Sequence, residues 1–231
     1  MRKILLLILF PLFVYGQDLT IVSITDAEAL TSTAFSKILN CTGTSADYTL
    51  DLPTAVGNEG GSIAIKGNSA LTKVVTIQGV SGQLIDGEAN RKLSTDGLIV
   101  VVSDGTNWIV INEVGSWIPY TPTWGGFDVD PTIVRADYFR VGKLCRARII
   151  INGSGTSGTT TFTVTVPFIA AEVSRSPTTL VLNAGTTQAG PGLAITRAGQ
   201  NTVDMYRDAT AGTWTGSGNK RADLDITFRI Q

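Results

Sequence analysis

Short runs of β-branched and other apolar residues, each closed by a small polar turn, constrain the fold of this chain more than any other feature. VVSDGTNWIVI, residues 101–111, is a clear case, because two apolar runs flank the turn residues Gly105, Thr106 and Asn107. Such runs separated by Gly, Asn and Asp are typical of β-hairpins. Similar runs follow one another through most of the chain after residue 37. The sequence therefore predicts an all-β fold.

Alternation within the runs predicts which side of each strand is buried. In the last run, Leu224, Ile226 and Phe228 alternate with polar residues. This period of two is expected of strands with one face on a core and the other in solvent.

One segment departs from the strand pattern. Apolar residues at 27, 30, 34, 35 and 38 follow helical spacing after a possible N-cap at Asp26, which predicts one short helix. No repeat of fixed period is visible elsewhere, so a solenoid or a propeller is not expected.

Residues 115–132, GSWIPYTPTWGGFDVDPT, divide the chain. Proline and glycine cluster there and the alternation lapses, as expected of a connector. The chain is 231 residues long and 43% hydrophobic, which leaves room for two small cores. We predict two tandem small β-sandwich or jelly-roll-like domains, over residues 17–114 and 115–231.

Residues 1–16 read as a targeting segment. Arg2 and Lys3 precede an apolar run from Ile4 to Val14, which is shorter than the roughly 20 residues of a spanning helix. Small residues at the positions preceding Gln17 predict a signal peptide cleaved before it. The alternative is an uncleaved hydrophobic anchor.

Composition excludes several function classes. The chain has no histidine, which removes His-dependent triads and His-ligated zinc. Its 18 basic and 19 acidic residues provide no cationic field for a nucleic acid. Cys41 and Cys145 lack metal or redox spacing and are expected to be buried free thiols, with a disulfide between the halves as the alternative. We expect no metal and no cofactor.

Two pairs of acidic residues are the best catalytic candidates, and neither is persuasive. Asp128 with Asp130, and Asp223 with Asp225, each place two carboxylates on one strand face, as a glycosidase or a calcium site would require. No nucleophile motif or third partner accompanies them, and solvated strand or turn positions explain them better. No enzymatic activity is predicted.

Arg146 and Arg148 lie on one face of a predicted strand. We interpret them as solvated strand charges, with recognition of an acidic sugar as the alternative.

Aromatic residues supply the candidate ligand contacts. Trp108 opens a strand of apolar residues, so a core or subunit contact is expected rather than a sugar-stacking platform. Trp214 lies in the polar, glycine-rich stretch ATAGTWTGSGNK, with Tyr206 nearby, and Trp124 lies in the connector, where it could pack between the halves. Exposed aromatic side chains stack on sugars and anchor interfaces. The predicted ligand-binding residues are therefore Trp214, Tyr206 and Trp124.

The order of the motifs carries a resemblance to a known group of proteins. YTLDLPTAVGNEGGSIAIKGNSALTKVVTIQGVSGQLIDG followed by LIVVVSDGTNWIVI resembles the small β-domain of bacteriophage fibre and spike proteins, over residues Lys37 to Asn112. The second half, from YTPTWGGF through YFRVGKLCRARIIING and TTFTVTVP, is similar to C-terminal domains of phage tail and receptor-binding proteins.

This resemblance implies a function. It predicts homotrimeric β-domains on a virion surface, contacts with other virion proteins, and attachment to a glycan or protein receptor of a bacterial cell. The predicted signal peptide departs from the pattern, because tailed phages assemble in the cytoplasm. A secreted bacterial adhesin or carbohydrate-binding module of phage origin is the alternative.

Overall fold

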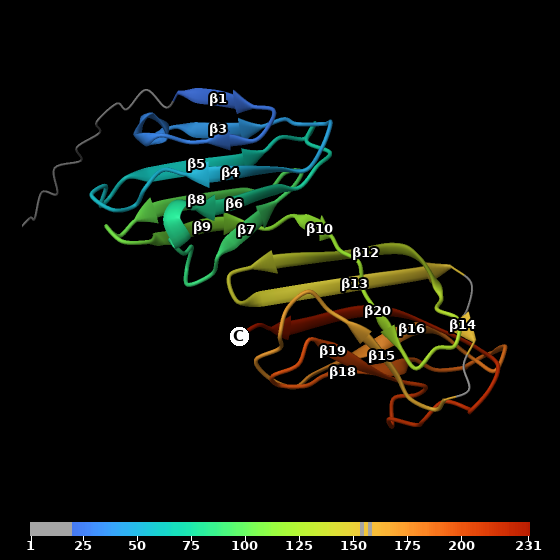
Figure 1. Ribbon diagram of the computed structural model, residues 1–231. Coiled ribbons are helices and arrows are strands. Elements are labelled where there is room, and N and C mark those ends of the chain that lie inside the picture. Colours follow the sequence, from blue (N-terminus) through green and yellow to red (C-terminus); the bar gives the residue numbers. More distant parts are fainter. Residues whose placement is uncertain (1–19, 153–154, 157–158) are drawn as a thin grey trace, which may run out of the picture.

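The computed structural model describes residues 20–152, 155–156 and 159–231, so the predicted signal peptide or anchor at residues 1–16 lies outside the described residues. The all-β prediction is confirmed: within the described ranges, the helical elements are two short 3-10 turns, η1 (Ser32–Ala34) and η2 (Val80–Gly82). Figure 1 shows two lobes, one coloured blue to green and the other yellow to red. We call residues 20–114 the N-terminal module and residues 115–231 the C-terminal module.

The N-terminal module consists of two sheets around one core. Its five-stranded sheet has the order β1-β3-β5-β8-β9, and its four-stranded sheet has the order β2-β4-β6-β7. The strands are β1 (Ile21–Ile24), β2 (Glu28–Ala29), β3 (Ile38–Cys41), β4 (Tyr48–Leu52), β5 (Ser62–Gly67), β6 (Val75–Gly79), β7 (Asn90–Leu93), β8 (Leu98–Ser103) and β9 (Trp108–Val114). Alternate residues of both sheets, such as Leu39, Ile65 and Ile77, fill the space between them.

The first six strands wind as parallel coils. β1, β3 and β5 run parallel in one sheet, while β2, β4 and β6 run parallel in the other, so the chain changes sheet after each strand. Ile21 pairs with Ile38, and Ile38 pairs with Ala64, which makes the successive coils 17 and 26 residues long. The expectation that no solenoid-like winding occurs is therefore wrong for these coils. Unequal coil lengths hide the winding from a search for a fixed period.

The antiparallel pairing typical of a jelly roll is confined in this module to its later strands. β7 pairs antiparallel with β6, and β8 pairs antiparallel with both β5 and β9. The prediction of a jelly-roll-like N-terminal domain is thus corrected: the module consists of parallel coils that end in a short antiparallel part.

The predicted short helix is also wrong. Its residues form β2, the 3-10 turn η1 and the start of β3. Glu28 pairs with Leu50, and the amide of Leu30 donates to the carbonyl of Asp51 at 2.8 Å. Leu30 and Ala34 are buried in the module core. Pairing with β4 and core burial therefore override the local helical spacing.

The hairpin predicted at residues 101–111 is confirmed. β8 and β9 pair antiparallel, and the Asp104 carboxylate accepts hydrogen bonds from the amides of Thr106 (2.8 Å) and Asn107 (2.6 Å) in the turn. Trp108 is 1% exposed, and its ring lies 6.2 Å from that of Phe35. Trp108 is therefore a core residue, and no face of its indole is open to a sugar.

The C-terminal module is a single antiparallel sheet of eleven strands that curls around its core. The main path is β10-β12-β13-β20-β16-β18-β19-β15-β11, with β14 beside β20 and β17 beside β16. The strands are β10 (Trp117–Pro119), β11 (Trp124–Gly125), β12 (Thr132–Val141), β13 (Leu144–Asn152), β14 (Gly155–Thr156), β15 (Phe162–Thr165), β16 (Ser174–Asn183), β17 (Thr186–Thr187), β18 (Gly192–Thr196), β19 (Thr202–Tyr206) and β20 (Asn219–Arg229).

The curl of this sheet occurs at β16. Residues 174–178 of β16 pair with β18, whereas residues 179–183 lie against β20, with an irregularity between Thr179 and Leu182. A bulge in a long strand lets one strand belong to two layers. The enclosed core includes Ile149, Phe162, Leu224 and Phe228.

Both cysteines are buried free thiols, as predicted. Cys41 lies in the core of the N-terminal module, and Cys145 lies in the core of the C-terminal module. Because the thiols belong to separate cores, the alternative of a disulfide joining the halves is excluded.

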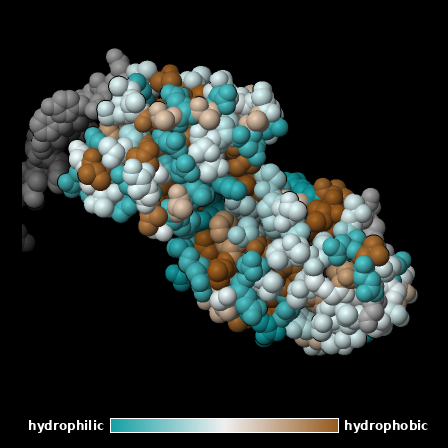
Figure 2. All heavy atoms as spheres, viewed as in Figure 1, coloured by the Kyte–Doolittle hydropathy of each residue, from teal (hydrophilic) through white to brown (hydrophobic). Residues whose placement is uncertain are grey.

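Polar contacts connect the modules. The Gly142 amide donates to the Glu113 carboxylate at 2.8 Å, and the Ser94 hydroxyl donates to the Trp117 carbonyl at 2.9 Å. Figure 2 shows hydrophilic residues gathered where the two lobes meet on the visible face.

Across the described ranges, no helix combines the length and the apolar character that crossing a bilayer requires.

Candidate functional site

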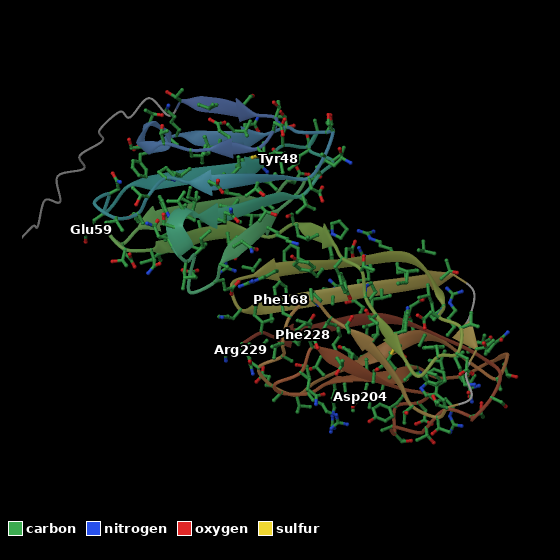
Figure 3. All side chains as sticks on the ribbon, viewed as in Figure 1. Tyr48, Glu59, Phe168, Asp204, Phe228 and Arg229 are labelled. Atoms are coloured by element: carbon green, nitrogen blue, oxygen red, sulfur yellow. The ribbon has the colours of Figure 1, made fainter. Side chains whose placement is uncertain are left out.

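A groove on the C-terminal module contains one of the predicted ligand residues. Tyr206, the last residue of β19, lines a groove of about 250 Å³ together with Arg197, Asp204 and three threonines at and just before the start of β15: Thr160, Thr161 and Thr163. Figure 3 shows Asp204 on the side of this module that faces away from the N-terminal module. The groove is therefore open to a large external partner.

Strand register brings the polar groups of the groove together. Asp204 pairs with Thr163 of β15, and the alternation of β19 places Asp204 and Tyr206 on the same outward face. Arg197 follows β18 at the start of the turn that leads into β19. The hairpin of β18 and β19 thus brings Arg197 back beside Asp204.

An ion pair defines the charge of the groove. The Arg197 Nε atom donates to Asp204 Oδ2 at 2.6 Å, and Arg197 Nη2 donates to the Tyr206 hydroxyl at 3.4 Å. The hydrogen bond with Asp204 raises the pKa of the Arg197 guanidinium, so this group stays charged. Charged donors and acceptors, hydroxyl groups and one aromatic ring are the groups that recognise sugars.

Trp214 does not line this groove, and its predicted exposure is wrong. It is 3% exposed, its Nε1 atom donates to the Met205 carbonyl at 2.8 Å, and its amide donates to the Thr160 carbonyl at 3.2 Å. Its ring also packs edge-on against Phe162, with 5.5 Å between centroids. The polar loop folds back so that the large apolar ring of Trp214 lies in the core. The hydrogen bonds of Trp214 then hold the backbone at Met205 and Thr160 beneath the groove.

Trp124 is likewise not a surface contact between the halves. It lies in β11, which pairs with β15, and it packs against the C-terminal core. Its ring is 5.5 Å from Phe127, and Phe127 is 4.4 Å from Phe162. The structure thus brings Trp124 and Trp214 together on either side of this phenylalanine pair, and of the three predicted residues Tyr206 alone lines the groove.

Arg197 and Asp204 are groove residues that sequence reasoning missed. The available signal was the short turn AGQN between two apolar runs, which predicts a hairpin. Register within that hairpin was needed to place Arg197 near Asp204, and alternation alone does not give register.

Arg146 and Arg148 lie on one face of β13, as predicted. Arg148 is positioned over Trp117, with its guanidinium 4.4 Å from the ring centroid. The Asp225 carboxylate accepts two hydrogen bonds from Arg146, at 2.7 and 2.6 Å, and Asp137 accepts two longer ones from Arg148. Arg146 therefore has its own carboxylate, whereas Arg148 shares Asp137 with Arg135, which donates to the same carboxylate.

The paired acids do not form a catalytic dyad. Asp225 is bound by Arg146, while Asp223 accepts the Ile151 amide at 3.1 Å and lies 3.6 Å from Arg221. Asp128 and Asp130 are both exposed. Among the residues that the structure describes, no three metal-ligating side chains are grouped as a metal site.

The chain matches no known family model, and no curated protein matches it. The groove, the sheet faces and the junction between the modules are therefore the features from which a function can be argued.

Proposed function

We propose that this protein is a non-catalytic, fibre- or spike-type structural protein of a virion surface that attaches the virion to a bacterial cell. In this proposal it is a homotrimer, and it contacts other virion proteins and a glycan or protein receptor on the cell. The observation that carries the proposal is the groove at Tyr206, which presents an aromatic ring beside the Arg197–Asp204 ion pair. The resemblance of residues 37–112 to phage fibre domains supports the same function.

The chemistry of the groove suits a sugar of the cell surface. The Tyr206 ring offers an apolar face, while Arg197, Asp204 and the threonine hydroxyls offer donors and acceptors. A groove of about 250 Å³ is small for a tight ligand site, because such sites typically measure about 300 to 1,000 Å³. Three weak sites on one trimer raise the apparent affinity by roughly 10² to 10⁴ without any new contact.

The N-terminal module offers a face for trimerisation. A row of apolar residues crosses four strands on the side of the five-stranded sheet that faces away from the core. The row consists of Ile21, Ile38, Ala64 and Val100. At one end of this row Ile21 is 66% exposed, and beside the other end Val114 of the edge strand, the partner of Leu98, is 50% exposed. Contiguous apolar surface of this kind is typical of an interface. In the proposed trimer, the other two copies cover this face.

Binding to an array of bacterial surface polysaccharides tests the attachment function. We expect Arg197→Ala and Tyr206→Ala to reduce binding at least about tenfold, because each removes a polar or aromatic contact of the groove. Arg229→Ala is the matched control, since Arg229 is exposed on a different part of the module and labelled in Figure 3. Equal binding by all three variants and the parent protein would contradict the proposal.

Light scattering tests the assembly. A homotrimer is expected at about three times the mass of one 24.4 kDa chain, allowing for removal of a signal peptide. Val100→Lys should dissociate it, because a charge would be buried at the interface, whereas Thr227→Lys on the exposed side of β20 should not. A parent protein at the mass of a single chain would refute the trimer.

A secreted bacterial adhesin or carbohydrate-binding module is the second candidate, favoured by the hydrophobic pattern of residues 1–16. Sequencing the N-terminus of exported protein separates the two, because a mature chain beginning at Gln17 would favour secretion. Capsid and portal genes beside the coding sequence would favour the virion. Release of oligosaccharides by the purified protein would contradict the absence of catalysis.

A further inference from the structure

The Arg197–Asp204 ion pair leaves hydrogen-bonding atoms free on both of its partners. Arg197 Nε donates to Asp204 Oδ2 at 2.6 Å, while Arg197 Nη2 donates to the Tyr206 hydroxyl at 3.4 Å rather than to the second carboxylate oxygen. Within the described ranges, Asp204 Oδ1 accepts no hydrogen bond and Arg197 Nη1 donates none. Both are charged hydrogen-bonding groups, so the groove offers one strong acceptor and one strong donor to a ligand.

A second exposed ion pair of the same module shows the difference. Arg146 donates through Nε and Nη2 to both carboxylate oxygens of Asp225, at 2.7 and 2.6 Å. The side chains of Arg146 and Arg197 are each 51% exposed. Exposure therefore does not decide how many atoms of such a pair are free. The Arg146–Asp225 pair uses both carboxylate oxygens and serves as a reference for the pair in the groove.

An apolar strip lies beside the ion pair on the outward face of β18 and β19. Tyr206 is directly opposite Leu193, and Asp204 is directly opposite Ile195. Ala194 lies in the C-terminal core, so the alternation of β18 places Leu193 and Ile195 on the outward face. Ile195 is nevertheless only 7% exposed and belongs to neither core, so side chains of the outward face cover it. The C–H face of a sugar ring packs against an apolar strip of this kind.

Hydroxyl groups form the other wall of the groove. Thr163 of β15 is directly opposite Asp204, and Thr160 and Thr161 line the groove beside it. A threonine hydroxyl both donates and accepts hydrogen bonds, as a sugar hydroxyl does. This wall therefore suits a ligand that carries several hydroxyl groups.

The charges of the groove cancel. Among the described residues that line it, Arg197 is the one basic side chain and Asp204 is the one acidic side chain. Arg175 of β16 lies on the same face as the partner of Ile195, but it does not line the groove. Its backbone is two strands away from Asp204, roughly 10 Å at the usual strand spacing. The free oxygen of Asp204 repels a carboxylate, and no surplus cation in the groove offsets this repulsion.

We propose that the groove binds a neutral sugar through two adjacent hydroxyl groups. One hydroxyl donates to Asp204 Oδ1, the other accepts from Arg197 Nη1, and the sugar ring packs against Tyr206 and Leu193. Adjacent hydroxyls of one ring suit a neighbouring acceptor and donor, because each hydroxyl can take either role. This inference rests on the proposed attachment function and names the class of sugar that the groove recognises.

Titration with methyl glucoside, methyl galactoside, methyl mannoside and glucuronate tests the proposal. The readout is the ¹⁵N signals of the Arg197 Nε–H group and the Asp204 amide in the intact protein. We expect at least one neutral glycoside to shift these signals saturably, and glucuronate to leave them unchanged. For the sugar that binds, the monodeoxy versions that lack either of two adjacent hydroxyls should bind about tenfold more weakly, and the other monodeoxy versions should bind as well as the parent sugar.

Asp204→Asn is the most informative variant, because it keeps the shape of the side chain and removes its charge. We expect it to weaken binding of the neutral glycoside about tenfold through loss of a charge-assisted hydrogen bond, and to allow glucuronate to bind at Arg197. Asp225→Asn removes the same charge from the reference pair with Arg146 and should change neither result.

Several results would overturn the inference. No shift with any of the three neutral glycosides, or shifts of equal size with glucuronate, would refute a neutral-sugar site. Dependence on hydroxyls that are not adjacent, or on none, would refute the paired contact with Asp204 and Arg197.

The polysaccharide array separates this inference from the attachment function. If binding that depends on the groove is confined to acidic polysaccharides, the neutral sugar is refuted and attachment stands. If neutral glycosides shift the groove signals but Arg197→Ala and Tyr206→Ala bind the array like the parent protein, attachment through the groove is refuted and the neutral-sugar site stands.

Discussion

Arg140 of the C-terminal module forms a two-pronged ion pair with Glu88 of the N-terminal module. Arg140 Nη1 donates to Glu88 Oε2 at 2.6 Å, and Nη2 donates to Oε1. The guanidinium is also positioned over Phe168, 5.0 Å from the ring centroid, and its Nε atom donates to the Gly142 carbonyl at 2.9 Å. A paired fork of this kind fixes direction as well as distance. We infer that it sets the orientation of one module against the other.

Removing the carboxylate should therefore loosen the junction. Glu88→Gln is expected to lower the free energy of unfolding by about 2 kcal/mol, less than for a fully buried pair because Glu88 is partly exposed. Urea unfolding measures the change, and Glu59→Gln at an exposed position is the control. A Glu88→Gln protein as stable as its parent would show that the pair does not stabilise the junction.

The same pair predicts a dependence on pH. Burial alone raises the pKa of Glu88, but the hydrogen bonds and charge of Arg140, together with the charges of Arg91 and Lys143, outweigh it, so the pKa lies below its usual range. The pair therefore stabilises the fold fully above the unfolded pKa of a glutamate, roughly 4.3, and this stability is lost as the pH falls through the lower folded pKa. Unfolding measured from pH 7 to pH 3 should show a smaller decline for Glu88→Gln than for the parent.

Trp214 is expected to support the groove from below. Trp214→Phe removes the hydrogen bond from Nε1 to the Met205 carbonyl and leaves a small cavity, at a cost of about 1 to 3 kcal/mol. Tyr206→Phe, which loses only a 3.4 Å contact with Arg197, should change stability little. Denaturant unfolding compares the two, and equal stability of Trp214→Phe and the parent would argue against this supporting role.

The two thiols should be inert in the folded protein. Burial raises the pKa of Cys41 to about 11, although the hydrogen bond with Tyr48 lowers this pKa by a smaller amount. Burial likewise raises the pKa of Cys145 to about 12, although the charge of Arg140 lowers it by a smaller amount. At pH 8 only about one Cys41 in 10³ would be a thiolate. Ellman's reagent should react with neither thiol before unfolding and with both in guanidinium chloride. Fast labelling of the native protein would contradict their burial.

Gly67 at the end of β5 should not tolerate a side chain. A Cβ atom there would lie 2.0 Å from the Ser94 carbonyl oxygen, a backbone atom that cannot move aside without disturbing the neighbouring segment. Gly67→Ala is expected to cost at least about 2 kcal/mol. Gly190→Ala, where nothing lies within 4 Å, should be nearly neutral. Thermal unfolding distinguishes them, and similar melting temperatures would disprove the close approach.

Local pattern was sufficient for the features that depend on a strand and its two faces. The hairpin at residues 101–111, the burial of Trp108 and the shared face of Arg146 and Arg148 follow from alternation and turn residues. These properties are local, because side chains of a strand alternate whichever strands lie beside it. The burial of the free thiols follows from the same apolar runs.

Tertiary structure decided which strands pair and where loops pack. The parallel coils depend on contacts such as Ile21 with Ile38, whose separation varies from coil to coil and leaves no period in the sequence. Trp214 lies in a polar loop by sequence, yet the loop folds back because burying its large ring in the core is favourable. The groove needs the register of β18 with β19, and the Arg140–Glu88 ion pair needs the two modules to meet. Each of these is a long-range relationship, which a local pattern does not specify.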